Sequence, residues 1–191
     1  MDVLVVGASP RPGGNTDLVC EYLTKRFSEL GLNPVTVMLR SFRIQPCRGC
    51  RECLRKEFCI IEDDMRILVD YLLRTKAIVI ATPVYFNSVP SILKAFIDRT
   101  WCLRGRLRNK VGGVVAIGRR YGHEQAVNTV ISFFLKHEMI VGFRGVCLYA
   151  FESGEVLNDV EGMRDLEKLA RRIHELLKIL ELGTSRASEV S

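Results

Sequence analysis

Short apolar runs alternate along the chain with longer amphipathic stretches, and this alternation limits the possible folds more than any other feature. Five runs rich in Val, Ile and Leu lie at residues 3–6, 34–39, 77–81, 111–117 and 141–150. Nearly continuous apolar runs are typical of parallel strands that are buried on both faces of a sheet. Because amphipathic helices that connect such strands cover both faces, we expect an α/β fold with a doubly wound, five-stranded parallel sheet.

Five amphipathic stretches follow these strands and predict helices. They lie at residues 16–30, 63–74, 91–101, 124–137 and 160–182. The apolar positions of the last stretch recur at helical spacing along one face. With 191 residues, the chain has the length of one domain. We therefore expect a single domain over residues 1–183 and a flexible tail over the small and polar residues 184–191.

Composition and charge narrow the class of protein. No apolar run reaches the length that spans a membrane, and the chain starts without a basic segment of the kind that opens a signal peptide. We therefore expect a cytoplasmic protein with no membrane contact. The net charge is +6, but the Lys and Arg residues are spread along the chain without interleaved aromatic residues or a DNA-binding motif. We expect no nucleic-acid partner.

Four of the seven cysteines lie within thirteen residues, after the second predicted strand. They are Cys47, Cys50, Cys53 and Cys59. Two successive C-x2-C steps are typical of loops that bind a [4Fe–4S] cluster, whereas structural zinc sites usually combine two separated pairs. An odd number of cysteines without a signal peptide does not fit a disulfide framework. The spacing favours an iron–sulfur cluster, with a zinc site or metal-free thiols as the alternatives.

The loop after the first predicted strand carries groups that bind anions. Residues 7–16 place Ser9, Arg11, Asn15 and Thr16 in a glycine-rich turn before a predicted helix. Hydroxyls, an amide, a guanidinium and free N–H groups at a helix N-terminus are suited to a phosphate. The loop contains neither the dinucleotide pattern G-x-G-x-x-G nor a P-loop lysine. It therefore predicts a phosphate site, with a simple turn and helix cap as the alternative.

Two further loops follow the third and fourth predicted strands, at the edge of the sheet where ligands of such folds bind. Residues 82–90 hold Tyr85, Phe86 and Asn87 between two prolines, and residues 118–125 are polar and contain two glycines. Aromatic residues beside an amide are suited to the edge of a planar ring. They are equally suited to packing against a neighbouring helix or subunit.

Together, these three loops resemble those of the flavodoxin-like NAD(P)H-dependent FMN reductases. The phosphate loop of that family matches residues 7–16, apart from the additional Ala8, and its second loop and following helix match residues 83–99. The third loop departs from the glycine-glycine-glutamine form of the reductases. The cysteine pattern, with five residues before Cys59, is similar to that of the iron–sulfur flavoproteins within this superfamily, which are known mainly from anaerobic archaea.

The resemblance implies a flavodoxin-like fold with a cysteine-rich insertion after the second strand, and it implies roles for individual residues. The FMN phosphate would be held by Ser9, Arg11, Asn15 and Thr16. The isoalloxazine would be bordered by Pro83, Val84, Tyr85, Phe86 and Asn87, together with Gly118, Arg119 and Gly122. A [4Fe–4S] cluster would be ligated by Cys47, Cys50, Cys53 and Cys59.

The same resemblance implies an FMN-dependent oxidoreductase that takes electrons from ferredoxin through the cluster to FMN. A small acceptor such as dioxygen or hydrogen peroxide would then be reduced. The alternative is an NAD(P)H-dependent FMN or quinone reductase in which the cysteine segment is structural or binds zinc. Members of the family form dimers that pair into tetramers, so we expect a homodimer or homotetramer. Tyr85, Phe86 and Trp101 supply an apolar surface suited to such a contact.

Overall fold

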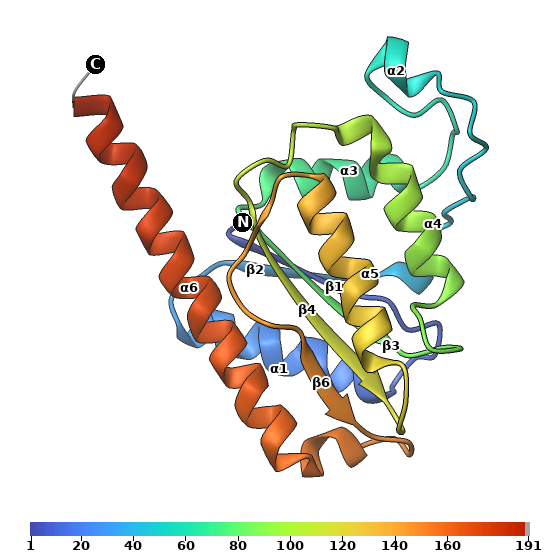
Figure 1. Ribbon diagram of the computed structural model, residues 1–191, viewed down its shortest axis with the longest axis vertical. Helices are drawn as coiled ribbons and strands as arrows, with labels where there is room; N and C mark the ends of the chain where they lie inside the picture. Colours follow the sequence, from blue (N-terminus) through green and yellow to red (C-terminus); the bar gives the residue numbers. More distant parts are fainter. Residues whose placement is uncertain (190–191) are drawn as a thin grey trace.

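A computed structural model of the chain describes residues 1–189 and contains one six-stranded parallel sheet (Figure 1). Its strands are β1 (Val3–Gly7), β2 (Pro34–Met38), β3 (Ala77–Pro83), β4 (Val111–Gly118), β5 (Ile140–Val141) and β6 (Val146–Tyr149). Their order is β2-β1-β3-β4-β5, and β6 also pairs with β4. The order reverses between β1 and β3, as in flavodoxin-like sheets. The expected doubly wound α/β fold is confirmed.

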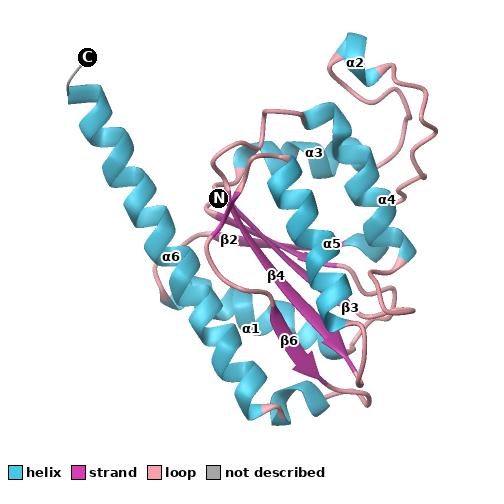
Figure 2. Cartoon of the chain, viewed as in Figure 1, coloured by secondary structure: helices cyan, strands magenta, loops and turns pink. Residues whose placement is uncertain are grey.

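Five helices cover the two faces of the sheet (Figure 1, Figure 2). One face packs against α1 (Asn15–Glu29) and α6 (Val160–Glu189). The other face packs against α3 (Met65–Arg74), α4 (Ser91–Arg99) and α5 (His123–Lys136). A short helix, α2 (Cys53–Lys56), belongs to the cysteine segment and stands away from the sheet (Figure 1). Three short 3-10 turns complete the chain: η1 (Leu39–Ser41), η2 (Thr100–Leu103) and η3 (Glu155–Asn158).

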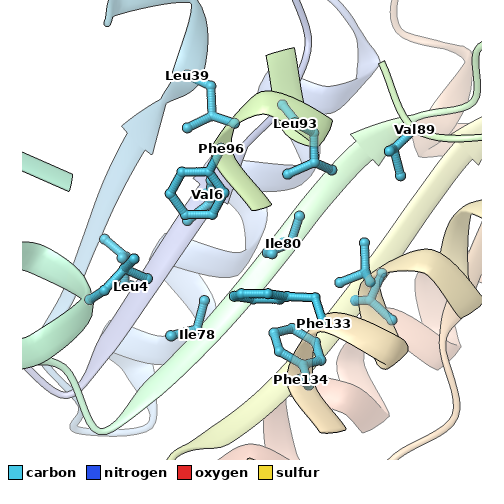
Figure 3. Packing of buried hydrophobic residues seen from close by; sticks show 14 of the residues in the cluster. Leu4, Val6, Leu39, Ile78, Ile80, Val89, Leu93, Phe96, Phe133 and Phe134 are labelled. Carbon is cyan, nitrogen blue, oxygen red and sulfur yellow. The ribbon is translucent and has the colours of Figure 1, made fainter. Parts of the chain in front are cut away.

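Alternation of side chains along the strands divides the core into two halves. Leu4 and Val6 of β1 face the layer of α3, α4 and α5, whereas Val3 and Val5 face α1 and α6. Successive side chains of a strand point to opposite faces, so an entirely apolar strand requires a helical layer on each side. Figure 3 shows the first half of the core, a buried cluster to which Phe96 of α4 and Val6 of β1 both belong.

The edge of the sheet beside β4 differs from the expected single strand over residues 141–150. The structure divides this segment into β5 and β6, and between its paired positions the segment uses two more residues than β4 does. The chain bends between Gly142 and Gly145, where an added Cβ atom would lie 2.2 Å from Leu176 or Val127. Side chains of α6 and α5 therefore contact the backbone directly at this bend and interrupt the strand.

The last helix is longer than predicted. It continues past residue 182 to Glu189, and residues 190 and 191 lie outside the described part. The helix therefore includes most of the segment 184–191, whose flexibility stays a prediction. A glycine such as Gly183 costs a helix only about 1 kcal/mol. Because helix formation is cooperative, this cost does not stop a helix that is already formed. Figure 1 shows that the C-terminal part of α6 extends beyond the sheet.

No helix within residues 1–189 is both long enough and apolar enough to cross a membrane.

Candidate functional site

Loops from four strands meet at the carboxyl edge of the sheet and line a cavity of about 470 Å³. Nine of the predicted residues line it: Ser9, Arg11, Asn15, Thr16, Pro83, Val84, Tyr85, Gly118 and Arg119. The strands end in register here, because Gly7 of β1 pairs with Ala81 of β3, and Pro83 pairs with Ile117 of β4. The structure therefore brings together most of the residues that the sequence assigns to one ligand.

The N-terminus of α1 presents unpaired donors at this cavity. Within the described residues, the N–H groups of Gly14, Asn15 and Thr16 form no hydrogen bond, as is usual for the first turn of a helix. Thr16 is buried, and its hydroxyl also has no partner in this part of the chain. A phosphate group would satisfy these donors and would be stabilised by the helix dipole. The residues present therefore fit the phosphate of FMN.

Asp17 and Arg40 hold the phosphate loop in shape. The Asp17 carboxylate accepts a hydrogen bond from the N–H of Gly13 at 2.8 Å and two from the Arg40 guanidinium at 2.7 and 2.8 Å. The hydroxyl of Ser9 accepts the N–H of Arg11 at 3.1 Å. Because Arg40 neutralises Asp17, this buried carboxylate does not repel an anion at the helix terminus. This pair was not predicted from the sequence, because its partners are 23 residues apart, with β2 between them in the chain.

Asn15 joins the phosphate loop to the loop that follows β6. Its Nδ2 donates to the carbonyl of Glu152 at 2.8 Å, and its Oδ1 accepts the N–H of Gly154 at 2.8 Å. The hydroxyl of Ser153 donates to the carbonyl of Gly13 at 2.9 Å, which adds a second link between the same loops. The Asn15 amide is thus engaged with protein groups. It acts here as a positioning residue, whereas the resemblance implies a direct phosphate contact.

Replacing Asn15 by Ala is expected to destabilise the protein by about 1–3 kcal/mol, since the three hydrogen bonds of its side chain to Glu152, Gly154 and Val156 are lost. Thermal unfolding of the ligand-free chain measures this change. FMN binding should weaken as well, because the two loops are no longer held together. Asn128→Ala is the matched control: Asn128 is exposed on α5 and makes no side-chain hydrogen bond within the described residues. Equal melting temperatures for Asn15→Ala and the unmodified chain would contradict this role.

The loop after β3 ends in a tight hairpin. Tyr85 and Ser88 exchange two backbone hydrogen bonds, of 2.8 and 2.9 Å, around Phe86 and Asn87. Both central residues have positive φ angles, 47° and 59°. Phe86 is fully exposed, and neither Phe86 nor Asn87 lines the cavity. Of the five residues of this loop that are predicted to border the flavin, Pro83, Val84 and Tyr85 line the cavity.

Gly122 allows the loop after β4 to contact this hairpin closely. Its φ angle is +84°, in the region that favours glycine, and an added Cβ atom would lie 2.4 Å from the Cα atom of Asn87. Gly122 does not line the cavity itself. Its role in this structure is to let two of the cavity loops support each other.

The loop after β6 completes the cavity, and the sequence did not predict it. Ala150, Phe151 and Glu152 line the cavity, and the guanidinium carbon of Arg119 lies 4.6 Å from the centre of the Phe151 ring. Loops at the carboxyl ends of all strands of such a sheet are candidates for ligand binding. Because the predicted edge strand extended to residue 150, the start of this loop was assigned to the strand.

The four clustered cysteines lie on one loop between β2 and α3, away from the cavity (Figure 1). Cys47 and Cys50 are exposed, Cys53 and Cys59 are partly buried, and none of the four is in a disulfide. Burial raises the pKa of the Cys53 thiol, and the neighbouring thiols of Cys59 and Cys47 add to the shift. These thiols are the donors that an iron–sulfur cluster requires. Within the described residues, however, no three Cys, His, Asp or Glu side chains are close enough to hold a metal ion.

A buried ion pair closes the base of this cysteine loop. The side chains of Arg99 and Asp63 are 1% and 0% exposed, and the shortest distance between their nitrogen and oxygen atoms is 2.7 Å. Asp63 also accepts the N–H groups of Gln45 at 2.8 Å and Met65 at 3.1 Å. Burial alone would raise the pKa of Asp63, but these hydrogen bonds and the charge of Arg99 outweigh it, so the pKa is lowered. Asp63 therefore remains ionised although it is buried.

A larger cavity, of about 660 Å³, lies between α4 and α5 beside the cysteine loop. Cys47, Trp101 and His137 are among its lining residues. It contains no strand-end loop and no helix N-terminus with open donors. We therefore assign the phosphate-bearing ligand to the smaller cavity at the sheet edge.

Comparisons with known proteins agree with this geometry. Residues 1–151 match the family model described as NADPH-dependent FMN reductase. An iron–sulfur flavoprotein of Methanocaldococcus jannaschii is 33% identical over 95% of this chain and 100% of its own length. One of Archaeoglobus fulgidus is 34% identical over 93% of this chain and 99% of its own length. Among solved structures, an NADH:FMN oxidoreductase in its apo form superposes with a TM-score of 0.68 at 16% identity, covering 91% of this chain and 88% of that one.

Proposed function

Because this chain belongs to the NADPH-dependent FMN reductase family and, within it, to the iron–sulfur flavoproteins, we propose that it is an FMN-dependent electron-transfer oxidoreductase. On this proposal, the cysteine loop accepts electrons from ferredoxin or a similar carrier and the cavity at the sheet edge delivers them to a small acceptor such as dioxygen or hydrogen peroxide. The observation that carries the proposal is the combination of an open phosphate cradle with four free thiols on one anchored loop.

At the sheet edge, the protein would hold FMN by its phosphate. The N–H groups of Gly14, Asn15 and Thr16 and the guanidinium of Arg11 are free to bind it. The cavity offers a single anionic cradle without a glycine fingerprint for a pyrophosphate, which supports FMN over FAD. Arg119 and Phe151, whose side chains stack on each other, also line this cavity.

On the cysteine loop, a [4Fe–4S] cluster would be held by Cys47, Cys50, Cys53 and Cys59. When bound, the two groups supply complementary chemistry, since an iron–sulfur cluster carries single electrons and FMN takes up one or two. The surrounding arginines offset the negative charge of four thiolates, and they also attract an acidic electron carrier. Arg48, Arg51 and Arg55 lie on the loop and are exposed.

The two proposed sites lie at opposite ends of α4. This helix starts directly after the second cavity loop and ends at Arg99, whose Nε lies 3.2 Å from the Sγ of Cys59. Its nine residues rise about 14 Å. Tyr85, Phe86 and Trp101 expose apolar surface that a second copy would cover. We therefore place the cysteine loop of one protomer near the flavin cavity of its partner, in a homodimer or homotetramer.

Chemical analysis and rapid kinetics test the proposal. Protein produced without oxygen is expected to contain FMN, iron and sulfide, and reduced ferredoxin is expected to reduce the flavin at least tenfold faster than NADPH does in stopped-flow mixing. Stoichiometric zinc without iron would refute the cluster. Faster reduction by NADPH would instead support an NAD(P)H-dependent FMN or quinone reductase with a structural cysteine segment. The description of the matching family, NADPH-dependent FMN reductase, is the observation behind this second function.

A further inference from the structure

Arg99 is the last residue of α4, and its guanidinium is one of the largest side chains that the fold buries completely. A buried guanidinium is costly unless every donor is satisfied and the charge is paired. Asp63 pairs with it through two hydrogen bonds, of 2.7 and 2.9 Å. The partners of its remaining N–H donors therefore indicate what this buried charge does in the fold.

The other donors of Arg99 reach both ends of the cysteine loop. One Nη atom donates to the carbonyl of Gln45, before the cysteines, at 2.8 Å, and the other donates to the carbonyl of Ile61, after them, at 3.3 Å. The Nε atom donates to the Sγ of Cys59 at 3.2 Å. A single planar group thus closes the loop and contacts one of its thiols.

None of the residues 46–60 is fully buried, although Cys53 and Cys59 pack against the core. Helix α2 contains no buried residue among those described, and Cys47 and Cys50 are exposed. Two hydrogen bonds close the loop without Arg99: the Asp63 carboxylate accepts the N–H of Gln45 at 2.8 Å, and at an outer clasp the Asp64 carboxylate accepts the N–H of Arg43 at 2.7 Å. Neither bond involves a thiol, whereas Arg99 combines loop closure with a contact to Cys59.

We propose that Arg99 is the positioning residue of the cysteine loop, which it closes while holding a charged N–H donor against the sulfur of Cys59. This inference rests on the proposed function for its effect on a cluster, whereas the closure of the loop holds without it. A hydrogen bond to a ligating sulfur and a nearby positive charge both favour the reduced, more negative state of a cluster. Arg99 should therefore raise the reduction potential of a cluster bound through Cys59.

Two substitutions of Arg99 distinguish its role in closing the cysteine loop from the effect of its positive charge. Arg99→Gln removes the charge and most of the donors, while Arg99→Lys keeps the charge but cannot bridge Gln45 and Ile61. In the full chain without a cluster, hydrogen exchange in residues 45–61 is expected to accelerate at least tenfold in both variants. Exchange in β1 and β3 should stay unchanged and shows that the fold is intact. Asp64→Ala is the control for the outer clasp and should leave the hydrogen bond to Cys59 in place.

In protein reconstituted with the cluster, the midpoint reduction potential can be measured. This potential should not change if the role of Arg99 is purely structural. Arg99→Gln is expected to lower the midpoint potential by at least about 59 mV, a tenfold change for a one-electron couple. Arg99→Lys should stay closer to the unmodified protein. Arg104→Gln is the matched control, since it removes a charge near Cys53 that makes no hydrogen bond to a thiol among the described residues, and its effect should be smaller.

Unchanged exchange in residues 45–61, or equal potentials for Arg99→Gln and the unmodified protein, would overturn the proposal. If Arg99→Gln does not fold, Arg99→Lys decides by the same exchange measurement. A chain that binds no iron at all would refute the proposed function, yet the exchange experiment would still test the closure by Arg99.

Discussion

Replacing Cys53 by Ala is expected to remove the cluster while FMN stays bound. Iron and sulfide should fall together, from about four of each per chain to less than about half an atom, because three thiolates do not complete a [4Fe–4S] site. The flavin should remain because its cavity is built from other loops, at the opposite end of α4 from the cysteine loop. Iron and sulfide analysis with the visible spectrum of the anaerobic protein measures both parts of this prediction.

The same loss is expected for Cys47→Ala, Cys50→Ala and Cys59→Ala. Cys147→Ala is a simple control, since Cys147 lies on β6 and should leave iron and sulfide unchanged. Cys102 is a stricter control, because it lies with Cys59 in the lining of a third cavity, of about 460 Å³, and its pKa is raised by burial and by the nearby Cys59 and Cys53 thiols. Retained iron in Cys53→Ala together with its loss in Cys102→Ala would show that the ligand set is wrong.

Replacing Arg11 by Ala is expected to weaken FMN binding roughly ten- to hundredfold. A hydrogen bond to a charged group contributes about 1.5–3 kcal/mol, and about 1.4 kcal/mol corresponds to a tenfold change in affinity. The Arg11 side chain lines the cavity and forms no ion pair within the described residues, so its charge is available to the phosphate. Quenching of FMN fluorescence during titration of the apoprotein measures the dissociation constant.

Arg74→Ala is the matched control for this measurement. Arg74 is exposed at the C-terminal end of α3, just before β3 begins, and therefore at the opposite edge of the sheet from the cavity. It removes the same charge from the chain without touching the site. Equal losses of affinity in the two variants would indicate a general effect of net charge, and an undiminished affinity in Arg11→Ala would contradict the phosphate assignment.

Structural features that depend on residues near each other in the sequence were predicted well, because local interactions determine them. The apolar alternation predicted the sheet and its two helical layers, and β1, β3 and β4 lie within a residue or two of their expected bounds. The glycine-rich turn before α1 was correctly predicted as the start of a helix with open donors. These features depend on the period of side-chain burial and on helix termini, both of which are local.

Residues that are distant in the sequence were missed, because their partners are chosen by the packed fold. The side chain of Asn15, predicted to contact the phosphate, also joins two loops, and Phe151 lines the cavity although its loop was assigned partly to a strand. Phe86 and Asn87, which remain predicted at the flavin border, occupy a hairpin with positive φ angles and do not line the cavity. No local pattern encodes these contacts.

The fold class, three of the loops that line the cavity and the loop that carries the four thiols were all predictable from the amino-acid sequence. Which side chains are free to bind a ligand and which hold loops together follows only from the packing of the folded chain. Arg99 and Asp63 illustrate the difference: they are 36 residues apart, and only the packing of α4 against the cysteine loop buries them as a pair. A buried charge without a partner is very costly in free energy. The role of Arg99 therefore depends on Asp63, which the fold brings beside it, and not on the arginine alone.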